Sequence, residues 1–94
     1  MVIPVQAFLP NVVAELIRKS PLSPEKVQFA WSAAVGSSVV RASSVMLEDG
    51  VLHVRVRDAA WSREITRSAR LIRGRLDSFL GPDVVRTLKI TIGQ

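Results

Sequence analysis

The chain has 94 residues, of which 48% are hydrophobic, and a formal net charge of +5. This length fits one small domain, residues 1–94, with a single core. The absence of cysteine excludes disulfides, thiolate catalysis and the common zinc sites that use cysteine. The opening MVIPVQAFLP has no basic leader and only a short apolar run. We therefore expect neither a signal peptide nor a membrane span, and a cytoplasmic location.

Two helices are expected in the first part of the chain. Residues 5–19 predict a helix with an apolar side, although Pro10 removes a hydrogen bond and favours a regular start at that residue. Ser23-Pro24-Glu25 is typical of a helix start, with serine as N-cap, proline in the first turn and an acid near the positive dipole end. Gly36 is expected to end this second helix. Its predicted buried face consists of Val27, Ala30, Trp31 and Ala34.

A β-hairpin is expected next. The β-branched residues between 38 and 47 favour a strand, although neither face of it is cleanly apolar. Glu48-Asp49-Gly50 predicts the turn, where glycine can supply a positive φ. The following strand alternates strictly. Its inward residues would be Leu52, Val54 and Val56, and its outward residues His53, Arg55 and Arg57.

A third helix and a last strand complete the pattern. Asp58 is a good N-cap, and Gly81-Pro82 would end the helix. A tryptophan-led apolar stripe follows the 3.6-residue period through Trp61, Ile65, Ala69, Ile72, Leu76 and Phe79 or Leu80. Residues 84–92 predict a strand with Leu88, Ile90 and Ile92 inward and Thr87, Lys89 and Thr91 outward. The element order α-α-β-β-α-β predicts a two-layer α+β domain with helices on one face of a three-stranded sheet.

The net charge is concentrated in one window of the chain. Residues 55–75 contain seven arginines against Asp58 and Glu64, which equals the whole net charge of +5. The first fifty residues balance four basic residues against four acidic ones. Such localised charge indicates a polyanionic partner, because self-repulsion otherwise disfavours it. The alternative is a solvated basic helix face that binds nothing.

The arginines suggest which residues would contact nucleic acid. At 100° per residue, Arg63, Arg67 and Arg70 fall within about 60° of one another on the outer face of one helix. The complete predicted contact set is Arg55, Arg57, Arg63, Arg67, Arg70, Arg73 and Lys89. Trp31, Trp61 and Phe79 lie on apolar faces and are expected in the core, which leaves little for base stacking. We therefore expect backbone contact without strong sequence preference.

Catalytic chemistry is not expected. His53 is the single histidine, its strand neighbours are arginines, and no carboxylate is spaced to orient it. The acidic residues are explained by helix starts and turns. No glycine-rich phosphate loop or metal-ligand cluster is present in the sequence, so no enzyme activity, cofactor, metal or small-molecule substrate is predicted.

The chain resembles the DciA family in several motifs taken together. These are Trp31-x4-Gly36, residues 47–56 (LEDGVLHVRV), residues 60–65 (AWSREI), residues 80–85 (LGPDVV) and the terminal Leu88-Lys89-Ile90. The resemblance implies a KH-like fold and a bacterial factor that helps the replicative DnaB-type helicase reach or load onto DNA. It also implies binding of single-stranded or branched DNA. The chain has no GXXG loop, so nucleotide clamping in the KH manner is not expected.

Three functional hypotheses follow. The first is a non-catalytic DNA-binding adaptor for the replicative helicase, associated with the nucleoid, with Phe8 and Leu9 as candidate partner contacts away from the arginines. The second is a KH-like RNA-binding accessory domain that uses the same arginines. The third is a protein-interaction domain whose arginines meet an acidic partner.

Overall fold

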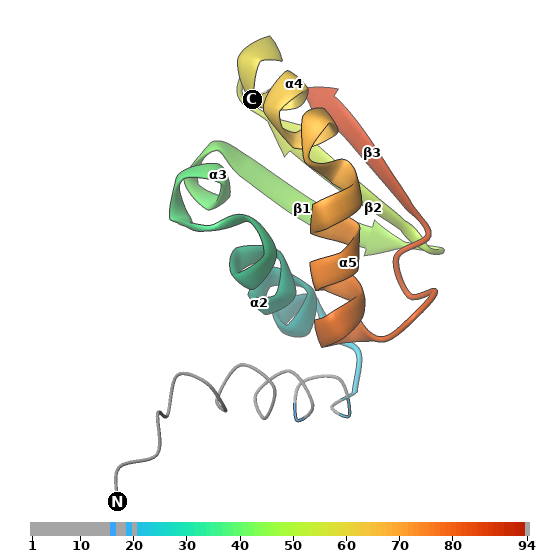
Figure 1. Cartoon of the computed structure of the whole chain (residues 1–94). Coiled ribbons are helices and arrows are strands. Elements are labelled where there is room, and N and C mark those ends of the chain that lie inside the picture. Colours follow the sequence, from blue (N-terminus) through green and yellow to red (C-terminus); the bar gives the residue numbers. More distant parts are fainter. Residues whose placement is uncertain (1–15, 17–18, 20, 94) are drawn as a thin grey trace, which may run out of the picture.

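The computed structural model describes Leu16, Lys19 and residues 21–93 (Figure 1). The expected first helix over residues 5–19 lies outside these residues, apart from Leu16 and Lys19, which are helical. The predicted partner contacts Phe8 and Leu9 also lie outside them. No helix in the described part of the chain is long and apolar enough to cross a membrane.

Helix α2 spans Pro24–Val35 and begins as the sequence predicts. The Ser23 side chain accepts a hydrogen bond from the Lys26 amide at 3.1 Å, and Pro24 occupies the first turn. Gly36 ends the helix with φ of 86°, a conformation that side chains with a Cβ rarely adopt. The apolar side of α2 is buried, and Trp31 is only 1% exposed.

The region from 38 to 47 is not a single strand, and that prediction is wrong. Directly after Gly36 the chain forms an additional, short helix, α3 (Ser37–Ala42). The Val40 amide of this helix donates to the Gly36 carbonyl. Strand β1 begins only at Ser43 and runs to Glu48. The β-branched Val39 and Val40 pack against the core from α3, so tertiary contact overrides their strand propensity here.

The hairpin between β1 and β2 (Val51–Val56) is confirmed. Asp49 and Gly50 have φ of 51° and 79°, and a tight hairpin turn needs two such consecutive positive values. The strands pair antiparallel, with Met46 opposite His53. Along β2, Leu52, Val54 and Val56 are buried and the alternate residues face out, as predicted.

The predicted third helix is broken into α4 (Ala59–Arg67) and α5 (Ala69–Leu80), so the single-helix prediction is wrong. Ser68 joins them with φ of −99° and ψ of 9°, and its amide is shared between the carbonyls of Glu64 and Ile65. The break lets α4 pack against β2 and β3 while α5 packs against α2. The Asp58 cap is confirmed, since its carboxylate accepts from the Trp61 amide at 3.1 Å.

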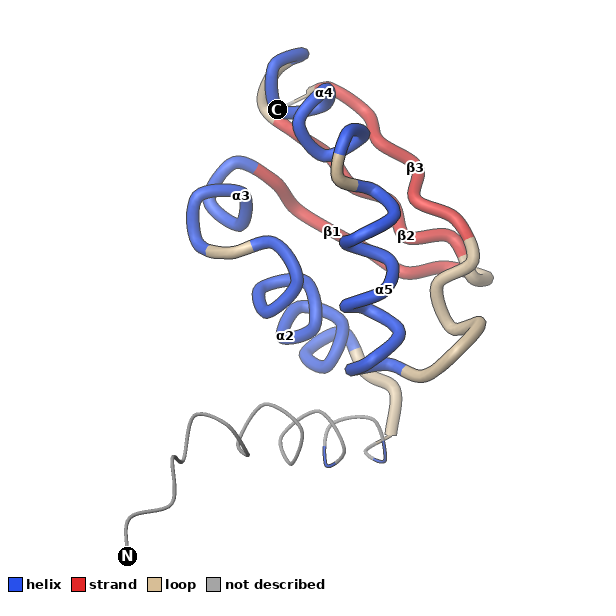
Figure 2. The backbone as a smooth tube through the Cα atoms, viewed as in Figure 1, coloured by secondary structure: helices blue, strands red, loops and turns tan. Residues whose placement is uncertain are grey.

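Strand β3 spans Thr87–Ile92, shorter than the predicted 84–92. Residues 84–86 are loop, in which Val85 is buried, and Asp83 turns the chain with φ of 68°. Ile92 was expected to face the core but is 57% exposed, because it lies at the end of an edge strand. The sheet order is β1-β2-β3 (Figure 2). Strand β3 runs parallel to β2, as the arrows in Figure 1 show.

The helices cover one face of this mixed sheet, and the core lies between the two layers (Figure 1). The two-layer α+β architecture is thereby confirmed. The described residues contain two helices more than predicted, because α3 is added and the third helix is divided into α4 and α5. Trp31 is a core residue as expected, and its ring N–H donates to the Ser43 hydroxyl at 3.0 Å. Trp61 and Phe79 are only partly buried and pack at the edge of the core.

Candidate nucleic-acid interface

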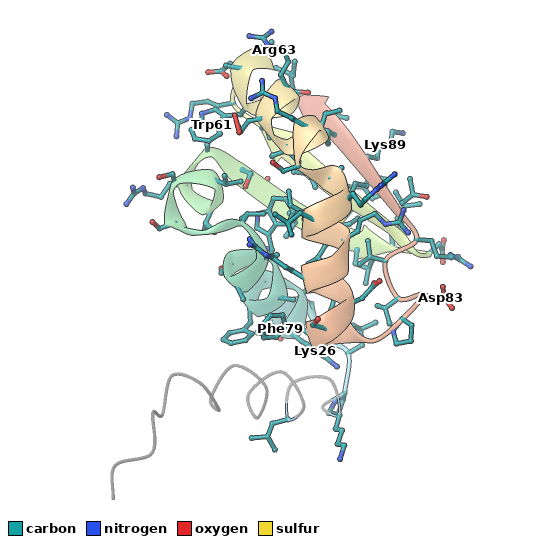
Figure 3. All side chains as sticks on the ribbon, viewed as in Figure 1. Lys26, Trp61, Arg63, Phe79, Asp83 and Lys89 are labelled. Atoms are coloured by element: carbon teal, nitrogen blue, oxygen red, sulfur yellow. The ribbon has the colours of Figure 1, made fainter. Side chains whose placement is uncertain are left out.

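The predicted contact residues fall on two separate surfaces. The first, here called the helical arginine surface, lies on the outer side of α4 and α5 and consists of Arg63, Arg67, Arg70 and Arg73, all exposed. The second, called the open sheet face, consists of the outward side chains of the three strands. Figure 3 labels Arg63 on α4 and Lys89 on β3, one on each surface. The break at Ser68 divides the helical arginines between two helices instead of aligning them along one.

Three of the four helical arginines have no carboxylate within ion-pair distance among the described residues. The exception is Arg67, whose Nη1 lies 3.6 Å from Oε2 of Glu64 one turn earlier. That pair is largely exposed, so it contributes little to stability, but it places a negative charge within the basic surface. Arg63, Arg70 and Arg73 are therefore free to meet phosphates.

The open sheet face is less uniformly basic. The parallel register places His53 beside Lys89 and Arg55 beside Thr91. However, Nε2 of His53 lies 3.9 Å from Oε1 of Glu48, which brings a carboxylate onto this face. Arg55 and Lys89 of the predicted second patch thus lie on one face of the sheet, where Glu48, which the sequence placed in the turn, partly offsets their positive charge.

Some arginines of the chain brace the fold. Nη2 of Arg57 donates to the Arg41 carbonyl at 3.2 Å, which ties the end of β2 to α3. Nη1 of Arg75 donates to the Ala34 carbonyl at 2.9 Å and ties α5 to α2. Arg57 was predicted as a DNA contact, and one side of its guanidinium is already engaged. No sequence signal separates such braces from free arginines, because both are exposed residues in a basic stretch.

Arg86 is a further residue that holds the fold together, and nothing in the sequence indicated this role. Its Nη2 donates to the Asp49 carbonyl at 3.0 Å, and its amide donates to the Gly50 carbonyl at 2.7 Å. The guanidinium covers Gly50 so closely that a Cβ there would lie 2.5 Å from Nε. Arg86 thus locks the hairpin turn to the loop before β3.

An apolar groove of about 580 Å³ lies between the start of α2 and the edge of β1. Its lining includes Leu22, which is 56% exposed, and Val27, Val45 and Val84. Asp49 at the turn carries the one charged side chain of the lining. The groove is lined by three segments that lie far apart in the chain, namely residues 22–28, residues 45–50 and Val84, so no local pattern in the sequence could indicate it.

The described residues contain no cluster of three or more histidine or acidic side chains that could hold a metal ion. The carboxylates have the local roles that the sequence indicated: Asp58 caps α4, and Glu48 and Asp49 lie at the hairpin. What this part of the chain offers chemically is cationic surface and an apolar groove.

Fold and surfaces together define a small basic α+β domain with exposed arginines on its helical layer. The family model described as "Dna[CI] antecedent, DciA" matches residues 4–90. The chain therefore belongs to the DciA family, which is related to helicase loading in DNA replication, and the resemblance noted in the sequence is confirmed.

Curated relatives carry less specific names. The chain is 37% identical over 62 residues to the "UPF0232 protein" of Mycobacterium bovis (strain BCG / Tokyo 172) and to a UPF0232 protein of Mycobacterium tuberculosis (strain H37Rv). These matches cover 65% of this chain and 33% of each relative. The matched part of the chain thus spans about a third of the length of the curated relatives.

Proposed function

We propose that this chain is a non-catalytic, DNA-contacting adaptor module that assists the replicative helicase at the start of DNA replication. Membership of the DciA family supports the link to helicase loading. The helical arginine surface supports the contact with DNA. On this proposal the protein works in the bacterial cytoplasm at the nucleoid, where both partners are found.

The observation that carries the proposal is the set of exposed guanidinium groups at Arg63, Arg70 and Arg73. Each is without a carboxylate partner among the described residues, and each lies on the outer side of α4 or α5. Guanidinium groups pair well with phosphate oxygens, and neutralised phosphates release counterions into solution. The free energy of binding would therefore be mainly electrostatic.

The proposed mode is contact with the sugar–phosphate backbone. Base stacking on single strands needs exposed rings, yet Trp31 is buried. Phe29 is 43% exposed, but its ring packs edge-on against Phe79 with centroids 5.8 Å apart. These rings are on α2 and the last turn of α5, and Trp61 of α4 packs against the core and is partly buried. Little sequence preference is expected from such an arrangement.

The helicase contact is proposed to use a different surface from DNA. An adaptor that positions a helicase must hold protein and nucleic acid at the same time. The apolar groove beside α2 suits a protein partner better than a polyanion, since Asp49 is its one charged lining residue. In the segment before α2, Phe8 and Leu9 remain proposed contacts with the helicase.

Competition binding tests the proposal. Fluorescence anisotropy with labelled single-stranded DNA would be repeated with unlabelled branched DNA, RNA or an acidic protein as competitor. Preferential displacement by DNA and salt-sensitive affinity are the expected results. Equal displacement by RNA would favour the RNA-binding alternative, and displacement by the acidic protein alone would favour the protein-interaction alternative.

A pull-down with the replicative helicase tests the second half of the proposal. Full-length chain immobilised on resin should retain the helicase in the presence of saturating single-stranded DNA. The double variant Phe8→Ser/Leu9→Ser should lose helicase capture while its DNA affinity stays near that of the wild type. Undiminished capture by a natively folded double variant would remove these two residues from the contact.

A further inference from the structure

Strand β3 forms one edge of the sheet, and it has no strand on its other side in the part of the chain that the structure describes (Figure 1). Two hydrogen bonds fix which way its backbone groups point. The Thr87 amide donates to the Gly50 carbonyl at 3.2 Å, and the Gly93 amide donates to the Val56 carbonyl at 2.9 Å. Odd-numbered residues of β3 therefore face β2, and the N–H and C=O groups of Leu88, Ile90 and Ile92 face outward.

The opposite edge of the sheet is protected, unlike this one. On β1 the backbone groups of Val45 face outward, and its carbonyl accepts a hydrogen bond from Nε2 of Gln28 at 3.2 Å. Helix α2 thus supplies a side chain that occupies the β1 edge. Proteins usually blunt exposed edges in this way or with charged side chains. On β3 Lys89 is the one charged residue, and Ile92 leaves 57% of its surface exposed.

We propose that the β3 edge binds the β3 edge of a second copy of this chain, in antiparallel orientation about a two-fold axis. Outward-facing residues must meet outward-facing residues for both strands to exchange hydrogen bonds. In the register centred on the strand, Ile90 of one copy pairs with Ile90 of the second copy, which satisfies this rule. Leu88 then pairs with Ile92 of the second copy, and a continuous six-stranded sheet results.

Charge favours this register over the one that pairs Lys89 with its own counterpart. The chain carries a net charge of +5, so two copies repel unless basic side chains avoid one another at the contact. Pairing at Ile90 places Lys89 opposite Thr91 of the second copy instead of opposite the second Lys89. Like charges directly opposite would destabilise a strand pair. The exposed Ile92 side chain would be partly buried against Leu88 of the second copy. The apolar face of the sheet would then continue across the two-fold axis.

The pairing would have a consequence for DNA contact, and this consequence alone rests on the proposed function. A two-fold axis between antiparallel strands lies perpendicular to the sheet, so the helical layers of both copies lie on the same side. Two helical arginine surfaces would then face one DNA molecule. The second contact becomes intramolecular and raises the overall affinity without any new kind of contact.

Sedimentation equilibrium without DNA tests the pairing itself. Wild-type chain should move from 10.3 kDa towards twice that mass as concentration rises. Ile92→Pro removes an outward N–H that β2 does not use, and a proline is tolerated at an edge strand. Because each change acts twice across a two-fold axis, Ile92→Pro and Ile92→Lys should each weaken dimerisation by about tenfold or more. Met46→Lys is the matched control, since Met46 is 59% exposed but lies on β1, and it should dimerise like wild type.

A cross-linking experiment tests the register. The chain has no cysteine, so single cysteines report unambiguously. A mixture of Lys89→Cys and Thr91→Cys chains should form a heterodisulfide under mild oxidation, since opposite residues of this kind lie about 4.5 Å apart between Cα atoms. A wild-type chain that stays monomeric at all concentrations would overturn the proposal. So would a dimer that Ile92→Lys leaves intact, or a mixture that forms homodisulfides only, whether or not the chain binds DNA.

Discussion

Removing the three unpaired helical arginines should weaken DNA binding by a calculable amount. The variant is Arg63→Ala/Arg70→Ala/Arg73→Ala. Each phosphate neutralised on a single strand contributes about −0.7 to the slope of log K against log salt concentration. If the four helical arginines each meet one phosphate, the wild-type slope is about −3, and the variant retains about −0.7. At ~0.1 M salt the loss is about 100-fold in affinity, or about 3 kcal/mol.

Fluorescence anisotropy with a labelled oligonucleotide between 50 and 200 mM salt measures these slopes. The fold should survive, because the three side chains are exposed and make no hydrogen bond to another described residue. Circular dichroism checks this. The control, Arg55→Ala/Arg57→Ala/Lys89→Ala, removes the same charge from the predicted second patch. Its circular dichroism spectrum checks whether loss of the Arg57 hydrogen bond to α3 alters the fold. It should keep most of the slope, because charges beyond about 10 Å are largely screened at this salt.

Two results would refute the reasoning. An unchanged slope in the helical variant, with a native circular dichroism spectrum, would remove α4 and α5 from the DNA contact. A larger loss in the sheet-face control than in the helical variant would move the contact to the open sheet face.

Three further predictions concern single residues. Glu64→Gln should tighten DNA binding by up to about fivefold at ~0.1 M salt by freeing its paired arginine, and unchanged anisotropy titrations would contradict this. Trp31→Ala should lower the free energy of unfolding by about 3–5 kcal/mol, and Trp61→Ala by less, because Trp61 is only partly buried; equal losses in urea denaturation would show that its burial is misjudged. Gly50→Ala should cost about 1–3 kcal/mol from its positive φ and the displaced Arg86 guanidinium. Part of that cost should vanish in the double variant Gly50→Ala/Arg86→Ala. A double-mutant cycle by urea denaturation measures this coupling.

Local patterns predicted the elements whose causes are local. The Ser23 and Asp58 caps, the Asp49-Gly50 turn and the alternation along β2 all depend on residues within a few positions of one another. The α+β layering followed from those elements and their order. The link to helicase loading came from the family resemblance and not from periodicity. The family match over residues 4–90 confirms the family.

The errors arose where distant contacts decide local structure. Val39 favours a strand by propensity, but packing against the core keeps it in α3. The apolar stripe through Trp61 and Ile72 suited one straight helix, yet α4 follows the sheet and α5 follows α2, so the chain breaks at Ser68. The arginine set was found from charge alone. Which arginines brace the fold, as Arg75 does, depends on carbonyls far along the chain.

Amide chemical-shift mapping of the full-length chain tests the central claim most directly. Single-stranded DNA would be added to isotopically labelled protein at low salt, and then displaced by added salt. The proposed interface predicts that the largest shifts cluster in residues 63–75, on both sides of Ser68, and that they reverse as salt rises. Shifts concentrated on the outward residues of β2 and β3, or around the apolar groove, would contradict a DNA contact through the helical arginine surface.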